Sequence, residues 1–204
     1  MKQTYFSWSQ DSDIRYIQTL LTENKLVIGT SDTVIGLFTA VSLQGYTLLN
    51  EVKQRQGMPY IILIENQYYL KSLTDRKYYE RYQEMLTYCW PGPVTTVFPA
   101  KKSLPHFMTG GGHTVAVRVP QHEGLLSLLK NMSCVFSTSA NRHGMPIPDE
   151  IKVVDPFIST HAAAIIINHQ HTAQPSTIID CTSLETIKII REGAYPTGKI
   201  KQIS

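Results

Sequence analysis

Residues 135–144 read Val-Phe-Ser-Thr-Ser-Ala-Asn-Arg-His-Gly. A short apolar run stops abruptly here in hydroxyl and amide side chains, those of Ser137, Thr138, Ser139 and Asn141. The pattern predicts a buried strand whose end carries polar groups. At the carboxyl ends of strands in an open α/β sheet, such groups commonly face a ligand. An ordinary strand-to-loop turn has the same composition, so the choice depends on other stretches of the chain.

The length and composition are those of a globular protein. The chain has 204 residues, which suffices for one large domain with a substantial core. A hydrophobic share of 42% and a charged share of 17% exclude a disordered chain or a coiled coil. The formal net charge of +3 permits an anionic ligand or affinity for RNA and requires neither. We therefore expect a single domain over residues 1–204.

The cysteines and the lengths of the apolar runs indicate in which cellular compartment the protein is expected. Cys89, Cys134 and Cys181 are isolated, and their odd number argues against a disulfide framework. Reduced thiols are typical of a cytosolic protein. Residues 1–10 have no apolar signal-peptide core, and the longest apolar run, 162–167, is far too short to span a bilayer. We expect a soluble, cytoplasmic protein that makes no use of a membrane.

Apolar periodicity predicts helices that alternate with strands. The expected helices are residues 11–24, 42–54, 74–89 and 122–131, and the expected strands include 25–29, 59–64, 94–98, 114–119, 162–167 and 186–191. The alternation predicts one α/β domain.

Local signals mark where these elements begin and end. Asp11 or Ser12 is expected to cap the first helix, and Gly57 is expected to end the second. Residues 101–113 contain three consecutive glycines and are expected to form a long loop, a candidate lid. The chain from Gly193 onward is expected to be a short tail.

Cations and small polar residues occur at three informative places. Lys53 and Arg55 lie where the helix 42–54 gives way to a loop. Cations in a last turn favour the helix dipole, and the same pair could also clamp an oligophosphate. Arg118 lies in an apolar strand and needs a buried acid or a bound anion as its partner. Residues 30–33 are four small polar residues after a strand, and they suit an amino acid or a phosphate.

Three tempting motifs fail on their details. Residues 193–199 have the spacing of a phosphate-binding loop, but Ile200 stands where Ser or Thr is needed, and we expect no helix to follow. His169 and His171 lie in a polar loop and are expected to be solvated rather than to bind a metal. Ser137 and Ser139 lack the elbow pattern of a hydrolase. We therefore predict no protein-bound metal.

Seven stretches, taken in order, resemble the motifs of the YrdC-like family, the threonylcarbamoyl-AMP synthases. Trp90-Pro91-Gly92-Pro93 is nearly identical to the family motif. Each match is weak alone, and their common order across nearly the whole chain makes them specific. The matching stretches are residues 30–37, 53–55, 90–95, 114–120, 137–144, 175–180 and 191–193.

The resemblance implies a fold and a reaction. The implied fold is α/β, with a twisted mixed sheet flanked by helices and an open, basic, concave site, in the short single-domain form. The implied reaction joins L-threonine, bicarbonate and ATP, with Mg²⁺ accompanying ATP, into threonylcarbamoyl-adenylate and pyrophosphate. The product would serve the t6A modification of tRNA, so tRNA and other enzymes of that modification are expected partners.

The resemblance also implies residue roles, residue by residue. Lys53 and Arg55 would be catalytic and hold the triphosphate. The threonine and bicarbonate end would use Ser31, Thr33, Arg118, Ser139 and Ser176. The ATP end would add Thr114, Ser137, Asn141 and Arg191.

The chain departs from the family pattern at Thr30, Ile35, Gln56 and Met58, where Pro, Tyr, Pro and a Lys or Asn are usual. These departures leave the main cations intact. They give weight to an alternative, an RNA-binding module of the same fold without synthase activity. The modest net charge and the lack of interleaved aromatic and basic residues count against that alternative.

Overall fold

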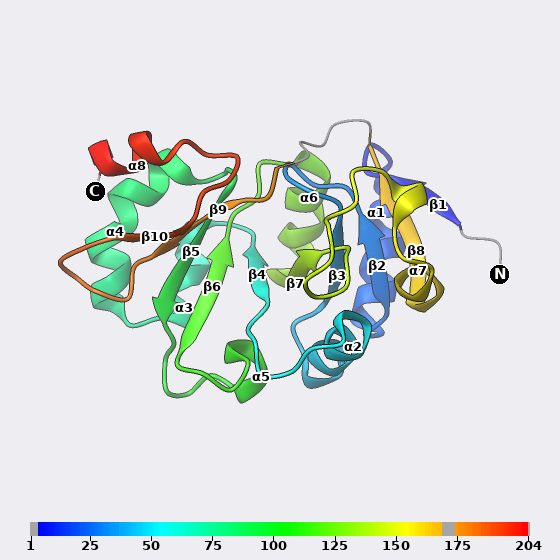
Figure 1. Cartoon of the computed structure of the whole chain (residues 1–204), viewed down its shortest axis with the longest axis horizontal. Coiled ribbons are helices and arrows are strands. Elements are labelled where there is room, and N and C mark those ends of the chain that lie inside the picture. The colour runs from blue at the N-terminus through cyan, green and yellow to red at the C-terminus, as the bar shows by residue number, and fades with distance from the viewer. Residues whose placement is uncertain (1–3, 169–173, 204) are drawn as a thin grey trace.

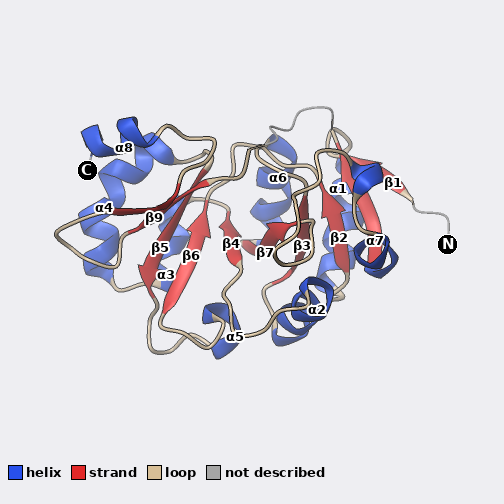
Figure 2. Ribbon diagram, viewed as in Figure 1, coloured by secondary structure: helices blue, strands red, loops and turns tan. Residues whose placement is uncertain are grey.

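The computed structural model describes residues 4–168 and 174–203, and within them the strands form one mixed sheet. The strand order is β1-β8-β2-β3-β7-β4-β6-β5-β9-β10 (Figures 1 and 2). The strands are β1 Tyr5–Ser7, β2 Leu26–Gly29, β3 Gly36–Ala40, β4 Ile61–Ile64, β5 Val94–Pro99, β6 Thr114–Arg118, β7 Cys134–Ser139, β8 Ala162–Ile167, β9 Thr177–Asp180 and β10 Lys188–Arg191.

Parallel and antiparallel pairs are both present. β2 runs parallel to β8 and antiparallel to β3, and β7 runs antiparallel to both β3 and β4. The sheet twists strongly along its length, with helices on its faces (Figure 2). The predicted twisted mixed sheet flanked by helices is confirmed.

The helices pack on the two faces of the sheet. They are α1 Asp11–Thr22, α2 Leu43–Lys53, α3 Leu70–Leu73, α4 Arg76–Cys89, α5 His106–Thr109, α6 Glu123–Met132, α7 Pro156–His161 and α8 Thr197–Ile203, with 3-10 turns at Gln67–Tyr69 and Ile151–Val153. Figure 1 shows α1 and α6 behind the strands β2 and β3, and α2 and α7 in front of them.

Side chains that alternate in direction along the strands contribute to a separate apolar cluster on each face of the sheet. Val27 of β2 and Val135 of β7 pack with the apolar faces of α1 and α6. Their neighbours Ile28 and Phe136 point the other way and join the larger cluster with α2, α4 and α7. Successive strand side chains point to opposite faces, so one buried run serves both layers.

Several expected boundaries are wrong in detail. The second helix ends at Lys53, and its cap residue is Gln54, with a left-handed φ of 51°, rather than Gly57. The first helix follows Gln10, and neither Asp11 nor Ser12 acts as its cap residue. Gln54 takes the left-handed cap conformation that glycine usually supplies, which composition alone does not reveal.

The segment 101–113 is more ordered than a long loop. It contains the short helix α5, in which Met108 and Thr109 are buried. Gly110 has φ of 62° and lies so close to the Met58–Pro59 backbone that an added Cβ would stand 2.3 Å from the Met58 carbonyl carbon. In this structure the segment is therefore packed against the start of β4, and its action as a lid stays a prediction.

The expectations of a short tail from Gly193 and of no helix after residues 193–199 are wrong, because the helix α8 spans Thr197–Ile203. Ile200 lies within that helix and is buried in the larger apolar cluster. The residue that replaces the Ser or Thr of a phosphate-binding loop is thus a core side chain. None of the described helices is long and apolar enough to cross a membrane.

Phe136 offers a test of this packing, because it is fully buried among the rings of Tyr46, Tyr60 and Phe107 at 6.1–6.5 Å. We predict that Phe136→Ala lowers the free energy of unfolding by about 3–5 kcal/mol, since it leaves a cavity. Urea denaturation measures this cost. The control is Ile190→Ala, whose side chain is 57% exposed. Equal costs for the two variants would contradict the assigned core.

Candidate functional site

Lys53 ends α2 with its ammonium enclosed by the turn that follows β7. The side chain is only 2% exposed. Its Nζ donates to the Ser139 carbonyl at 2.7 Å, to the Asn141 Oδ1 at 2.9 Å and to the Asn141 carbonyl. Ser139 Oγ also donates to Asn141 Oδ1, at 2.6 Å. Lys53 is therefore in direct contact with two other residues that the sequence predicted for the site, although Ser139 and Asn141 lie 86 and 88 positions further along the chain.

This enclosure changes the acidity of the lysine. Burial, and secondarily the Arg55 charge, lower the pKa of Lys53 from 10.5 to about 7. Hydrogen bonds from the nitrogen to three oxygen acceptors favour the ammonium form, but burial outweighs them.

Arg55 lies two residues further on, at the same end of the sheet. Its guanidinium stacks over the Tyr60 ring, with 4.5 Å from Cζ to the ring centroid. Tyr60 in turn packs on Phe136, and Ile61 pairs with Ser137 across β4 and β7. Arg55 also lines an open cavity of about 600 Å³ at the end of α2. Arg55 and the turn 137–141 therefore lie on the same side of the molecule.

A second group forms around Arg118, whose side chain is 4% exposed. Its Nη2 pairs with the Asp32 carboxylate, its Nη1 donates to Thr33 Oγ1 at 2.9 Å, and its Nε donates to the Gly92 carbonyl at 3.0 Å. Burial lowers the pKa of Arg118, and the Asp32 carboxylate opposes that shift. Of the two partners that the sequence allowed, an acid or an anion, the structure shows the acid.

Hydrogen bonds between neighbouring hydroxyl and carbonyl groups stabilise the stretch 30–33. Ser31 Oγ lies 3.1 Å from Thr33 Oγ1 and donates to the Val34 carbonyl at 2.9 Å. Asp32 accepts a hydrogen bond from the Gln121 amide at 3.0 Å through its second carboxylate oxygen. Asp32 thus joins the loop after β2 to the end of β6.

Strand register brings the first two groups together. Gly36 of β3 pairs with Ser139 of β7, and the Ala140 amide donates to the Ile35 carbonyl at 2.9 Å. A Cβ on Gly36 would lie 3.3 Å from the Thr138 carbonyl and 3.6 Å from Ser137 Oγ. The loop 30–35 and the turn 137–141 are therefore neighbours.

A third group lies at the starts of β5 and β9. Ser176 Oγ is 2.8 Å from Thr95 Oγ1, and Arg191 Nη2 donates to the Ser176 carbonyl at 2.8 Å. The Thr177 amide donates to the Pro93 carbonyl at 2.9 Å, next to the Gly92 carbonyl that holds Arg118. The Trp90–Pro93 stretch therefore links Ser176 and Arg191 to the Arg118 group.

Thr114 stands apart from these contacts. It begins β6, opposite Pro99, and is half-buried. Two residues later, Ala116 pairs with Ile61, which places Thr114 near the start of β4 and thus at the Arg55 end.

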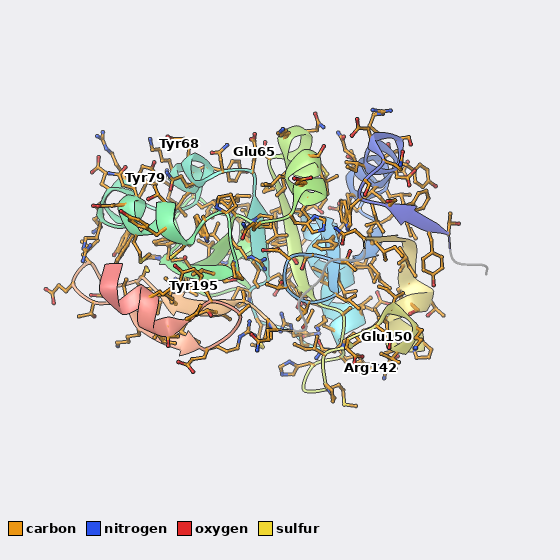
Figure 3. The ribbon with its side chains drawn as sticks, turned by 90° about the horizontal axis from the view of Figure 1, so that it is seen from above. Glu65, Tyr68, Tyr79, Arg142, Glu150 and Tyr195 are labelled. Carbon is orange, nitrogen blue, oxygen red and sulfur yellow. The ribbon has the colours of Figure 1, made fainter. Side chains whose placement is uncertain are left out.

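The segment after the turn is tied back to the protein. Asn141 Nδ2 donates to the Met145 carbonyl, and Arg142 Nη2 donates to Asp155 at 3.0 Å. Figure 3 shows Arg142 and Glu150 together at one edge, far from Tyr68 and Tyr79. Hydrogen bonds therefore connect the segment 142–155 to the turn at its beginning and to the start of α7 at its end.

Sequence reasoning missed several contacts because they join distant positions. Thr30 Oγ1 and Asn168 hold one another at 2.9–3.0 Å, and Asn168 also contacts His122 at 2.9 Å. Asp32, Gln121 and His122 line an open cleft of about 1130 Å³. The polar character of 30–33 was the only signal in the sequence for this network.

The buried cations Lys53 and Arg118 donate to protein oxygens and do not line an open surface. The open, basic, concave site therefore stays a prediction. No three His, Cys, Asp or Glu side chains gather for a metal among the described residues. His169 and His171 lie outside the described residues.

Comparison with known families and proteins gives a consistent result. The model of the Sua5/YciO/YrdC family, described as "Telomere recombination", matches residues 19–193. A threonylcarbamoyl-AMP synthase of Pyrococcus abyssi is 31% identical over 194 residues, which cover 93% of this chain and 56% of the relative. The chain thus spans little more than half of that relative's length. A threonylcarbamoyl-AMP synthase of Shigella flexneri is 34% identical over 176 residues, covering 83% of this chain and 91% of the relative.

Solved structures agree on the fold. Pyrococcus abyssi Sua5 complexed with L-threonine has a TM-score of 0.85 at 28% identity, covering all of this chain and 61% of that one. Escherichia coli YciO has a TM-score of 0.81 at 18% identity, covering 97% of this chain and 98% of that one. The second likeness shows the fold alone.

The buried pair Asp32–Arg118 gives a stability prediction. Removing the acid leaves a buried, unpaired guanidinium, so Asp32→Ala should lower the free energy of unfolding by about 3–5 kcal/mol. The control is Glu80→Ala, which breaks the exposed pair with Arg76 and should cost less than about 1 kcal/mol. Chemical denaturation of both variants measures the contrast. Similar small costs would show that the Asp32 pair is not a stabilising constraint.

The lowered pKa of Lys53 predicts a pH trend. Between about pH 7 and pH 10.5 the unfolded chain holds a proton on Lys53 that the folded chain has released. The contribution of this group to the free energy of unfolding therefore rises with pH across that window. Urea denaturation from pH 7 to pH 9 should show wild type gaining stability relative to Lys53→Met. The control Lys130→Met, at an exposed lysine, keeps Lys53, so its free energy of unfolding should follow that of wild type over this pH range. A difference between wild type and Lys53→Met that does not change with pH would refute the shift.

Proposed function

The chain belongs to the Sua5/YciO/YrdC family, and from that membership we propose that it is a threonylcarbamoyl-AMP synthase. It forms threonylcarbamoyl-adenylate and pyrophosphate from L-threonine, bicarbonate and ATP, and is thus a nucleotidyltransferase. The observation that carries the proposal is the contact of Lys53 with Ser139 and Asn141 beside Arg55. It brings two of the matched motifs together, and relatives of that name cover most of the chain.

The reaction has two bond-forming steps. The threonine amine attacks the bicarbonate carbon, and loss of water gives a carbamate. A carbamate oxygen then attacks the α-phosphorus of ATP, and the bond from that phosphorus to the bridging oxygen breaks as pyrophosphate leaves. Both partners of the second step are anions, so their mutual repulsion is the main obstacle.

Fixed positive charges reduce the repulsion between the two anions, and the site orients them for reaction. Arg55 and Lys53 supply charge at the triphosphate end, and a planar guanidinium suits two phosphate oxygens at once. Mg²⁺ enters with ATP and neutralises part of the triphosphate charge. Orientation of bound reactants supplies up to about 7–11 kcal/mol of barrier reduction, and no covalent protein intermediate is needed.

The remaining residues divide between the two ends of the site. At the threonine and bicarbonate end, Arg118 donates to the Thr33 hydroxyl and so fixes the position of that group. The other groups at that end are Ser31, Ser139 and Ser176. The ATP end uses Thr114, Ser137, Asn141 and Arg191.

The product serves the t6A modification of tRNA in the cytoplasm. Threonylcarbamoyl-adenylate is a mixed anhydride, so an acyl-transferring enzyme that acts on tRNA must consume it. Association with such partner enzymes and with tRNA follows from this role.

Arg55→Ala should reduce kcat/KM for ATP by about 10–150-fold, because a charge-assisted contact contributes about 1.5–3 kcal/mol. Pyrophosphate release measures the rate, and wild-type release should require both threonine and bicarbonate. Arg15→Ala, on the exposed side of α1, is the matched control and should behave as wild type. An unchanged kcat/KM in Arg55→Ala would remove the assigned role. Release without threonine or bicarbonate would contradict the proposed reaction.

A further inference from the structure

The two cations at the end of α2 differ in what they can do. We propose that Lys53 is a positioning residue that holds the turn 139–141 from within the protein, while Arg55 is the cation that meets the ligand. The proposal deepens the proposed function, on which it rests only for naming that ligand as a triphosphate.

The first support is a count of protons. An ammonium has three N–H donors, and Lys53 Nζ has three acceptors: the Ser139 carbonyl, the Asn141 carbonyl and Asn141 Oδ1. With every donor engaged and the side chain 2% exposed, no N–H remains for a phosphate oxygen. Lys53 therefore makes no direct hydrogen bond to the ligand, and it orients the ligand through the turn that it holds.

The second support is that the main chain of Lys53 grips the same segment. The His143 amide donates to the Lys53 carbonyl at 3.2 Å. The turn is therefore fastened on both sides of Asn141, once by the side chain of Lys53 and once by its backbone. A lysine that served chiefly as a mobile phosphate contact would not need this double attachment.

The third support is the rigidity of the anchor. Leu49 and Val52, on the last turns of α2, are fully buried in the larger apolar cluster. The helix closes at Gln54 with cap hydrogen bonds to Asn50 and Glu51. A group built on a packed helix end positions its partner more accurately than one built on a loop.

Arg55 has the opposite character. It is half-buried, its Nη2 reaches the Pro59 carbonyl only at 3.5 Å, and its buried Nε makes no hydrogen bond to any residue that the structure describes. The guanidinium stacks over the Tyr60 ring and also interacts with the Tyr60 hydroxyl, and these contacts fix the plane of the guanidinium. This is the arrangement of a cation prepared for an anionic ligand.

The test compares Lys53→Met with Arg55→Met, with Lys130→Met as the exposed control. Backbone hydrogen exchange over residues 137–145 is measured in the free protein, so it does not depend on the reaction. We expect at least a tenfold faster exchange there in Lys53→Met and no change in the other two variants. Unchanged exchange in Lys53→Met, or an equal change in Arg55→Met, would overturn the proposal. If Lys53→Met fails to fold, Lys53→Gln, which keeps two N–H donors, replaces it.

Kinetics provides the second readout. Loss of a positioned turn should lower kcat in Lys53→Met at saturating substrates, with KM for ATP changed less than threefold. Loss of a ligand contact in Arg55→Met should raise KM for ATP at least tenfold. A raised KM for ATP with unchanged kcat in Lys53→Met would show direct contact and overturn the assignment. If no variant or wild type turns over, the exchange result still decides the role of Lys53 while the proposed function fails.

Discussion

A cation can leave water only where protein oxygens replace its hydration, and this constraint shapes both halves of the site. Lys53 meets it with two carbonyls and an amide oxygen of one turn. Arg118 meets it with a carboxylate, a hydroxyl and a carbonyl from three separate stretches. In each case the buried charge fastens together segments that the sequence keeps far apart. The geometry of the loops is thus set by the needs of two charges rather than by their own turn propensities.

The sheet supplies the frame for these fastenings. Because β7 lies between β3 and β4, the end of β7 has the loop 30–35 on one side and the start of β4 on the other. Alternating side chains along the strands fill the two apolar layers, and the polar residues lie at the strand ends, outside both layers. Position in the sheet therefore explains why the hydroxyls and the amide of this turn lie beside the loop 30–35 and on the same side of the molecule as Arg55.

Much of this could be predicted from the sequence where the signal is local. The existence of the strand before the 137–141 turn, of the helix that carries Lys53 and of the apolar β6 that holds Arg118 follows from periodicity over a few residues, although the helix and strand ends do not. The partners of the charges do not, because Asp32 and Arg118 are 86 positions apart and composition alone allowed an acid or an anion equally. The left-handed cap at Gln54 was missed because glycine is the residue that usually takes this conformation.

The central claim is that Arg55 and the turn 137–141 face the same anion. A crystal structure with a non-hydrolysable ATP analogue and L-threonine tests it most directly. The account predicts one phosphate group within hydrogen-bond distance of both the Arg55 guanidinium and a donor from residues 137–141. A triphosphate bound elsewhere, or held by only one of these two groups, would contradict it.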